Sequence, residues 1–343
     1  MDILLGTHHL VHFGGSELVM YDLAKHFRST DHNVTVVTFL YDYPVRKLFE
    51  EAQIRVINIL QDKLTQTDFD LMWTQHWPVL YDLFYRWNVN VRHAVHSCLS
   101  PYEPLERPPL FANHLSLCLA NSNETRDRLI AGKVKPDQIY VFGNCVPDDY
   151  FEYYKENLTD LKRIAVVSNH VPEEVRSAAN LLNGRGLKVD IYGIGHLFQH
   201  VTKDVLLDYD AVITIGRTVQ QAMALGIPVY CYDRFGGPGW LTHENFKKAE
   251  HFNFSGRCTR RKLNEHQLVS EVINRYPAAL QSRKQLYHHA VDNYRLSKNV
   301  NHVLKLVDQK PPVDKKNIMA LYPSVRERNE NYLRTLAERK REG

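Results

Sequence analysis

The sequence predicts an α/β protein made of two doubly wound domains, each with a parallel sheet, and three observations lead to that class. Short apolar runs alternate with helical stretches along most of the chain, as they do where helices cover both faces of a parallel sheet. The alternation restarts after a polar, aromatic-rich segment at residues 147–162. The length of 343 residues suits two cores of roughly 150 residues better than one.

The first half of the chain begins with a candidate strand at Asp2–Gly6 and a helix over Ser16–Phe27. The next segment, Asn33–Leu40, is a β-branched apolar run between polar residues, which is typical of a strand buried on both faces. Shorter apolar runs continue to the end of this half, at Arg55–Ile59, Leu71–Thr74, Arg92–Val95, Leu115–Ala120 and Ile139–Phe142.

The second half repeats the alternation and ends in a charged segment. Strands are expected at Arg163–Ser168, Leu187–Tyr192, Ala211–Ile215 and Pro228–Tyr232, and helices at Glu173–Leu182, Thr218–Leu225 and Ser324–Glu342. We therefore predict an N-terminal domain over residues 1–150 and a C-terminal domain over residues 151–310. A linker and charged helix over residues 311–343 follow, and this part is able to pack back on the first domain.

Composition limits the classes of function. A net charge of +4 is too weak to argue for a nucleic-acid partner, although it is compatible with phosphate ligands. The five cysteines are scattered and include no CxxC pair, which indicates reduced thiols.

We expect a cytoplasmic protein without signal peptide or membrane span, because no apolar run approaches about 18 residues. Peripheral membrane contact stays open. The spacing of histidines, cysteines and carboxylates suggests no metal site.

Parallel strands end at one edge of their sheet, so the loops that follow strands are the places to look for a ligand. Gly14 and Gly15 lie between the first strand and the first helix and are followed by Ser16 and Glu17. We interpret them as a loop whose backbone approaches a ligand at a helix N-terminus, which suits an anion or sugar hydroxyls. A tight turn with Ser16 as N-cap is the alternative.

Two histidines, His76 and His96, also follow predicted strands. An imidazole in that position can hydrogen-bond a substrate hydroxyl or titrate near neutral pH. The chain has 18 histidines, so a structural or exposed role is the alternative for each of the two.

The strongest phosphate-binding candidate is Gly216-Arg217-Thr218, which joins a predicted strand to a predicted helix. A flexible glycine, a cation and a hydroxyl stand there together at a helix N-terminus. An ordinary capped helix with an exposed arginine is the alternative. Another candidate group follows the first strand of the second half and consists of Ser168, Asn169 and His170, which could hold a donor or cap the next helix.

A glycine-rich loop, Phe235 to Trp240, follows the strand Pro228–Tyr232. Gly236 and Gly237 would permit close backbone approach to a sugar, and Trp240 could stack on an apolar sugar face. The alternative is a rigid turn with Trp240 in the core.

Taken together, these segments resemble the glycosyltransferases of family 4, whose GT-B fold has two Rossmann-like domains with parallel sheets facing a central cleft. The opening GGSE, the position of His96 and the FGNCVPDDYF stretch resemble family segments of the first domain. YGIG, which contains Gly193 and Gly195, is similar to a Gly-x-Gly turn of the second domain. QAMALGIPVYCYDRFGG at residues 221–237 is the most specific match.

The residue patterns and the resemblance together give a set of predicted site residues. His96 and Arg217 would be catalytic, and His76, Gly14, Gly15 and Glu17 would lie on the acceptor side. The donor side would comprise Ser168, Asn169, His170, Gly193, Gly195, Gly216, Arg217, Thr218, Gln221, Gly236 and Gly237. The sequence departs from the family where Gln221 replaces a glutamate, and where SNHVPEEV lacks the usual cation pair, for which Arg217 is the nearest substitute.

The function expected from this resemblance is transfer of a sugar, most simply a hexose, from a nucleotide diphosphate sugar to an acceptor. The acceptor would be a glycan, a lipid-linked sugar or a small molecule in glycan or glycoconjugate synthesis. The reaction would be retaining and would need no metal or other cofactor. The alternatives are a nucleotide-sugar epimerase of the same fold and a non-catalytic relative that binds nucleotide sugar.

Overall fold

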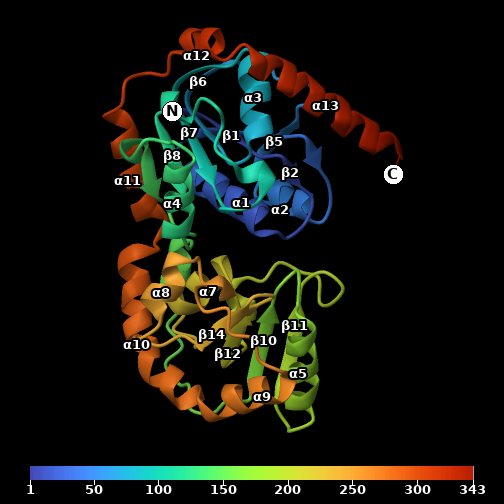
Figure 1. Cartoon of the computed structure of the whole chain (residues 1–343), viewed down its shortest axis with the longest axis vertical. Coiled ribbons are helices and arrows are strands. Elements are labelled where there is room, and N and C mark those ends of the chain that lie inside the picture. The colour runs from blue at the N-terminus through green and yellow to red at the C-terminus, as the bar shows by residue number, and fades with distance from the viewer. Residues whose placement is uncertain (343) are drawn as a thin grey trace. The chain divides into compact units, whose positions relative to one another are not determined.

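The computed structural model describes residues 1–342, with side chains for residues 1–338, and its fold has two units (Figure 1). The first unit comprises residues 1–121, 125–142 and 302–342, and the second comprises residues 122–124 and 143–301. The chain therefore returns to the first unit after completing the second. Each unit has its own parallel sheet and its own hydrophobic core.

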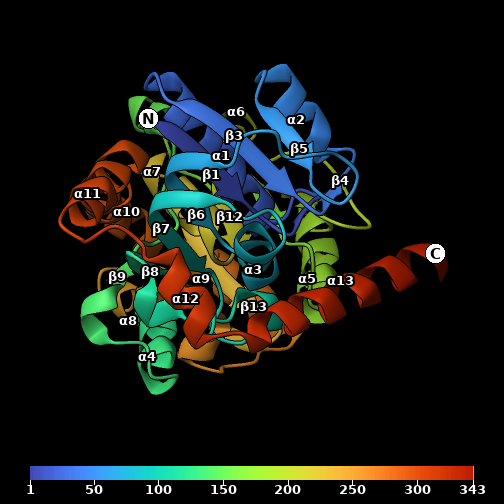
Figure 2. The same cartoon turned by 90° about the horizontal axis from the view of Figure 1, so that it is seen from above.

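The first unit is built on a seven-stranded sheet with the order β5-β3-β1-β6-β7-β8-β9 (Figure 2). All neighbours in it are parallel. The strands are β1 (Asp2–Gly6), β3 (Asn33–Thr38), β5 (Arg55–Asn58), β6 (Asp68–Thr74), β7 (Asn90–Cys98), β8 (Leu117–Ala120) and β9 (Ile139–Val141). A small parallel pair, β2 (His9–Leu10) with β4 (Leu40–Tyr41), lies beyond the main sheet. The strand order reverses between β1 and β6, which makes their carboxyl ends a topological switch point.

The helices associated with this unit are α1 (Gly15–Ser29), α2 (Val45–Glu51), α3 (Trp77–Tyr85), α4 (Asn123–Ala131), α12 (Lys315–Leu321) and α13 (Ser324–Glu342). The short segment Pro104–Glu106 forms a 3-10 helix. Helix α3 is almost entirely buried, and helix α13 packs against it (Figure 1). Ile318 of α12 and Val325 of α13 belong to the same hydrophobic core as the sheet.

A fully buried carboxylate, Asp82 of α3, fixes the C-terminal helix in place. Its oxygens accept hydrogen bonds from the Arg86 guanidinium at 2.8 and 2.5 Å and from the Trp87 indole at 3.1 Å. The side-chain amide of Asn329, on α13, donates to the same carboxylate at 2.9 Å. Because a buried charge is tolerated only when it is paired and hydrogen-bonded, this network couples α13 to the first unit.

The second unit is built on a five-stranded sheet with the order β11-β10-β12-β13-β14. Its strands are β10 (Arg163–Val167), β11 (Lys188–Tyr192), β12 (Ala211–Thr214), β13 (Val229–Asp233) and β14 (Gly236–Trp240). The first four are parallel, and β14 runs antiparallel to β13. Here the order reverses between β10 and β12, so a second switch point lies at their carboxyl ends.

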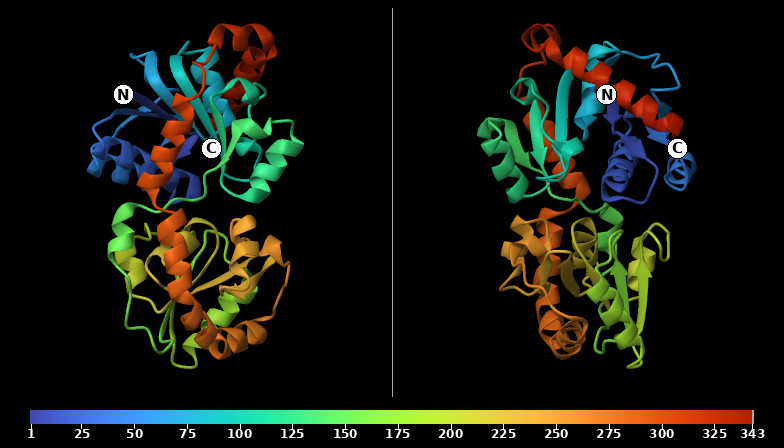
Figure 3. Two further views of the ribbon diagram at one scale, coloured as in Figure 1. Left: turned by 90° about the vertical axis from the view of Figure 1, so that its left-hand side faces the viewer. Right: turned by 45° about the vertical axis from the view of Figure 1, so that its right-hand side comes forward.

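Helices cover this second sheet, and Figure 3 shows α9 and α10, in orange, beside it. The helices are α5 (Glu173–Asn183), α6 (Lys203–Leu207), α7 (Arg217–Ala224), α8 (Phe246–His251), α9 (Glu265–Asn274) and α10 (Tyr276–Asn293). Helix α11 (Leu296–Asp308) begins in the second unit and continues into the first. Within residues 1–342, none of the helices combines the length and apolar character that a membrane crossing needs.

The predicted α/β class with two parallel sheets is confirmed, and the differences from the predicted elements are local. Strand β7 continues to Cys98, so His96 lies inside the strand and not just after it. Strand β14 was not predicted, because the sequence GGPGW lacks the β-branched alternation that signals a strand. Trp240 at its end is buried, with its indole N–H donating to the Val272 carbonyl at 3.3 Å, so the core interpretation of Trp240 is correct.

Replacing Asp82 by alanine should destabilise the protein by about 3 kcal/mol or more, because Arg86, Trp87 and Asn329 would lose a shared buried acceptor. Urea unfolding followed by circular dichroism measures the change. The matched control is Glu51→Ala, which removes the exposed pair of Glu51 with Lys47 and should cost at most about 1 kcal/mol. Equal effects of the two substitutions would contradict the role given to Asp82.

Candidate functional site

The switch point of the first unit brings together polar residues that follow β1 and β6. Nδ1 of His76 accepts a hydrogen bond from the backbone N–H of His8 at 3.1 Å and lies 3.0 Å from the Thr7 hydroxyl. Gln75 donates to the same hydroxyl at 3.0 Å and to the Ser16 carbonyl at 2.7 Å. Since Nδ1 of His76 is an acceptor, the ring carries its proton on Nε2 in the neutral form.

A chain of hydrogen-bonding groups extends from this point to the C-terminal helix. The hydroxyl of Tyr332, on α13, lies 2.6 Å from Nε2 of His8, and Nδ1 of His8 lies 3.1 Å from Nδ1 of His9. Nε2 of His9 is in turn 3.6 Å from a carboxylate oxygen of Glu17. His8, His9 and Tyr332 were not predicted as site residues. The position of the two histidines directly after β1 could have indicated them, whereas nothing in the sequence places Tyr332 there.

The structure shows what surrounds the glycine pair before α1. A Cβ atom on Gly14 would lie 2.3 Å from Oε2 of Glu17, so Gly14 makes room for the chain's own carboxylate. Glu17 accepts a hydrogen bond from the Ser16 hydroxyl at 2.9 Å and lies in the first turn of α1, where the helix dipole favours a negative charge. An anionic ligand is therefore not expected at this helix end. Nothing lies within 4 Å of a Cβ placed on Gly15, which leaves that position open.

Glu106 is a second buried carboxyl group beside the histidines. One of its oxygens lies 3.8 Å from Nε2 of His76, and the other is buried without a hydrogen-bond partner in the described chain. Burial is the main cause that raises the pKa of Glu106 from 4.5 to about 8, and the charges of Glu103 and Glu17 add to it. Burial likewise lowers the pKa of His8 to about 4, with His9 adding to the shift, and lowers that of His76 well below 6.5. Near neutral pH these three side chains are therefore mainly uncharged.

His96, the predicted catalytic histidine, is completely buried in β7. Its Nδ1 lies 2.8 Å from the Thr74 hydroxyl, whereas its Nε2 makes no hydrogen bond of ordinary geometry to a described residue. Burial is the main cause that lowers the pKa of His96 to about 3, and the backbone of Arg107 acts in the opposite direction. The ring is thus neutral at physiological pH, and its catalytic role remains a prediction.

In the second unit, predicted donor-side residues follow three neighbouring strands, β10, β11 and β12. A Cβ atom on Gly193 would lie 1.9 Å from the Ser168 carbonyl oxygen, and Gly193 has φ +143°, so only glycine fits there. Gly216 has φ +60° and is the N-cap of α7, whose first residue is Arg217. Gly195 has φ +82°, and a Cβ atom added to it would meet no other atom within 4 Å.

The other predicted donor-side residues differ in what they contact. The Ser168 hydroxyl accepts from the backbone N–H of His170 at 3.1 Å, which stabilises the turn after β10. Asn169 and Thr218 are half-buried beside this turn and at the start of α7. Gln221 is buried and donates to the Tyr150 hydroxyl at 3.1 Å, so at least one of its amide hydrogens is used within the chain.

Close backbone contacts, which the sequence does not reveal, explain why glycine occupies positions 236 and 237. A Cβ on Gly236 would lie 2.1 Å from the Arg261 carbonyl oxygen, and one on Gly237 would lie 2.0 Å from the Cys231 carbonyl oxygen. The glycines therefore allow β14 to pack closely against neighbouring backbone. This contact explains them without a sugar, and the prediction that they hold the donor receives no support from their geometry.

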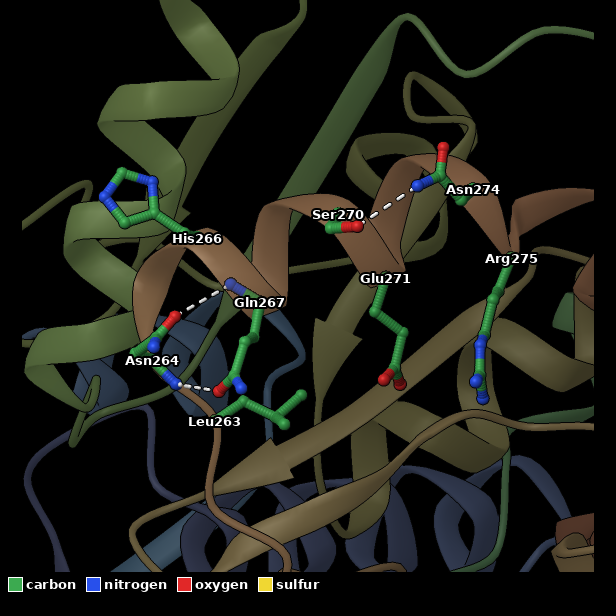
Figure 4. Close-up of a pocket in the computed structure, with 8 residues that line it drawn as sticks. All are labelled: Leu263, Asn264, His266, Gln267, Ser270, Glu271, Asn274 and Arg275. Atoms are coloured by element: carbon green, nitrogen blue, oxygen red, sulfur yellow. Dashed lines mark hydrogen bonds between the residues drawn. The ribbon is translucent and has the colours of Figure 1, made fainter.

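A shallow hollow of about 500 Å³ lies along α9, and Figure 4 shows the side chains that line it. Asn264 and Gln267 bond to each other's backbone as a capping box, and Glu271 is held by Arg261. No residue predicted from the sequence lines this hollow. Among residues 1–342, no group of three or more histidines, cysteines and carboxylates has an arrangement that could hold a metal ion.

The raised pKa of Glu106 predicts a pH-dependent effect of Glu106→Gln. The unfolded chain releases the carboxyl proton of Glu106 near its usual pKa of 4.5, whereas the folded chain releases it near a pKa of about 8. The contribution of protonated Glu106 to the stability of the fold is therefore complete below pH 4.5. It is lost as the pH rises toward 8. Glutamine cannot ionise. The variant should therefore be more stable than the wild type at pH 8, by an amount on the order of a few kcal/mol, and nearly equal to it at pH 5.

Thermal unfolding of both proteins between pH 5 and pH 8 measures this difference. The control is Glu103→Gln, which changes an exposed carboxylate in the same segment and should give a much smaller trend, because its charge is only a secondary cause of the raised pKa of Glu106. A stability difference that is constant with pH would show that Glu106 is already ionised in the folded protein.

Residues 13–150 match the model described as Glycosyltransferase Family 4. No curated protein matches the sequence.

Solved structures of GT-B proteins match almost the whole chain at low sequence identity. HepE from Anabaena, in complex with UDP-glucose, has a TM-score of 0.63 and 14% identity, covering 90% of this chain and 100% of its own. A glycosyltransferase from Rickettsia africae has a TM-score of 0.59 and 14% identity, with 90% and 98% covered. A protein from Listeria monocytogenes, described as a candidate UDP-N-acetylglucosamine 2-epimerase, has a TM-score of 0.51 and 14% identity, with 89% and 95% covered. Residues 13–150 therefore correspond to a glycosyltransferase family 4 domain, and the chain has the GT-B glycosyltransferase-like fold.

Proposed function

We propose that the protein transfers a hexose from a nucleotide diphosphate sugar to an acceptor hydroxyl, with retention of configuration and without a metal ion. The second unit would bind the donor, and the first unit would supply His96 and the acceptor-side residues Glu17 and His76. The observation that carries the proposal is the turn from β12 into α7. There Gly216, at φ +60°, brings the backbone N–H groups of the helix start and Arg217 to the switch point of the sheet.

The chemistry of the leaving group supports this assignment. Cleavage of the bond between sugar and diphosphate leaves negative charge on the phosphate oxygens, and positive groups fixed in advance stabilise that charge. The N-terminal end of α7 carries a partial positive charge, and its N-cap Gly216 has no side chain to occupy it. Arg217, the first residue of the helix, is able to add a full charge and a planar donor group.

The carboxyl ends of β10 and β11 would complete the donor site. The close approach of Gly193 to Ser168 leaves the edge of the sheet without a side chain at that position. The Anabaena protein HepE was solved with UDP-glucose, which makes a uridine nucleotide the first donor to test. Retention of configuration and a glycan, lipid-linked sugar or small molecule as acceptor follow from the family 4 resemblance.

A second candidate, nucleotide-sugar epimerisation, is favoured by one specific observation. Such a reaction needs acid–base groups near the sugar, and the first unit contains two buried carboxyl groups, Glu17 and Glu106, beside His9 and His76. Glu17 and His76 were predicted from the sequence as acceptor-side residues, whereas Glu106 and His9 were not. Incubating the protein with UDP-glucose alone separates the candidates, since an epimerised sugar nucleotide in the absence of any acceptor would favour the epimerase.

Arg217→Ala should weaken binding of UDP at least tenfold, because a charge-assisted contact with the diphosphate would be lost. The measurement is the UDP-dependent rise in melting temperature, since a ligand that binds the folded form raises apparent stability. The control is Arg185→Ala, which removes an exposed arginine before β11, at the opposite end of the sheet. An unchanged UDP response in Arg217→Ala would remove the diphosphate assignment.

A further inference from the structure

The first unit contains two histidine–glutamate pairs of the same construction. Nε2 of His9 lies 3.6 Å from Oε1 of Glu17, and Nε2 of His76 lies 3.8 Å from Oε1 of Glu106. Both distances exceed that of an ordinary hydrogen bond. The rings of His9 and His76 are stacked with their centroids 5.4 Å apart, so the two pairs are neighbours.

The proton positions on both rings can be assigned from their other contacts. His76 carries its proton on Nε2, because Nδ1 accepts from the backbone N–H of His8. For His9 the assignment follows from the series of hydrogen bonds that begins at the Tyr332 hydroxyl. If the Tyr332 hydroxyl donates to Nε2 of His8, then Nδ1–H of His8 donates to Nδ1 of His9, and His9 carries its own proton on Nε2, facing Glu17.

The opposite direction of donation along this series of hydrogen bonds is disfavoured. It would place the proton of His9 on Nδ1 and aim the lone pair of Nε2 at the carboxylate of Glu17, which lies 3.6 Å away. Two groups that only accept hydrogen bonds would then face each other. Each pair therefore presents an N–H donor and a carboxyl oxygen across a gap that a direct hydrogen bond does not close.

A hydroxyl group is able to bridge the two atoms of such a pair from one side, because its oxygen accepts from the imidazole N–H while its hydrogen is donated to the carboxyl oxygen. A phosphate dianion or a carboxylate has no hydrogen to donate and would be repelled by the charge of Glu17. Buried polar groups normally have partners, and Oε2 of Glu106 has none in the described chain although the residue is only 9% exposed. This oxygen is a second, independent indication that a polar ligand belongs here.

We propose that the pairs His9–Glu17 and His76–Glu106 bind two hydroxyl groups of an uncharged polyol, and that this polyol is the sugar acceptor. The inference rests on the proposed transferase function and specifies its acceptor as a neutral, hydroxyl-rich sugar in place of a phosphorylated or acidic one. Tyr332 acts as a positioning residue, because through His8 it fixes which nitrogen of His9 carries the proton.

The test measures direct binding and needs no knowledge of the natural acceptor. Methyl α-glucopyranoside, methyl α-galactopyranoside and methyl α-mannopyranoside are the neutral probes, and inorganic phosphate and glycerate are the anionic probes. Saturation-transfer NMR and titration calorimetry on the full chain should detect at least one neutral glycoside, and the anions should not displace it. Glu17→Gln should weaken that binding about tenfold, because a charge-assisted hydrogen bond becomes a neutral one.

Further variants distinguish the loss of a histidine–glutamate pair from general damage to the fold. His9→Phe keeps an aromatic ring but removes the N–H and should also lose glycoside binding, whereas Glu103→Gln changes an exposed carboxylate nearby and should leave it unchanged. In Tyr332→Phe, nitrogen chemical shifts should report a changed proton position on His8 and His9. Tyr322→Phe, in the same C-terminal segment, should not change them.

Three results would overturn the inference: no neutral glycoside binds, the anions compete equally well, or Glu17→Gln and His9→Phe bind as the wild type does. The UDP response of the same samples separates this failure from failure of the proposed function. A protein that still binds UDP but shows one of these results keeps its proposed donor site and loses only the acceptor assignment.

Discussion

The candidate site depends on one geometric constraint, which is that neighbouring parallel strands end at the same edge of their sheet. In the first unit this constraint brings Thr7 and His8, after β1, next to His76, after β6, although nearly seventy residues separate them along the chain. In the second unit it brings the turns after β10, β11 and β12 together, with Gly193 directly against Ser168. In both sheets the strand order reverses at the strands concerned, so each set of polar residues lies at a switch point.

Electrostatics distinguish the two edges. In the second unit a helix start with Arg217 favours an anion, as a diphosphate requires. In the first unit Glu17 already occupies the positive end of α1, directly beside Gly14. Burial keeps Glu106, His8 and His76 mainly uncharged near neutral pH. One edge therefore suits a phosphate group and the other suits uncharged hydroxyls, which is the division that sugar transfer from a nucleotide donor requires.

The sequence predicted the sheets well because apolar, β-branched runs such as Asn33–Leu40 are a direct consequence of burial on both faces. It also predicted the loops after the strands, since these follow from topology. It did not predict β14, whose glycines are explained by close contacts with the backbone of Cys231, on the preceding strand, and of Arg261, farther along the chain. Glu106 lies in a segment without periodic pattern, and Tyr332 reaches His8 from a helix that Asn329 links to Asp82 of α3. Such residues become visible only when long-range packing is known.

The central claim is that the carboxyl edge of the second sheet binds the nucleotide. Hydrogen–deuterium exchange of the full chain with and without saturating UDP tests it most directly, because it locates the bound nucleotide without a substitution. The account predicts slower exchange in the turns after β10, β11 and β12, at residues 168–170, 193–195 and 216–221. Slower exchange confined to α9 and its hollow, with those three turns unchanged, would contradict it.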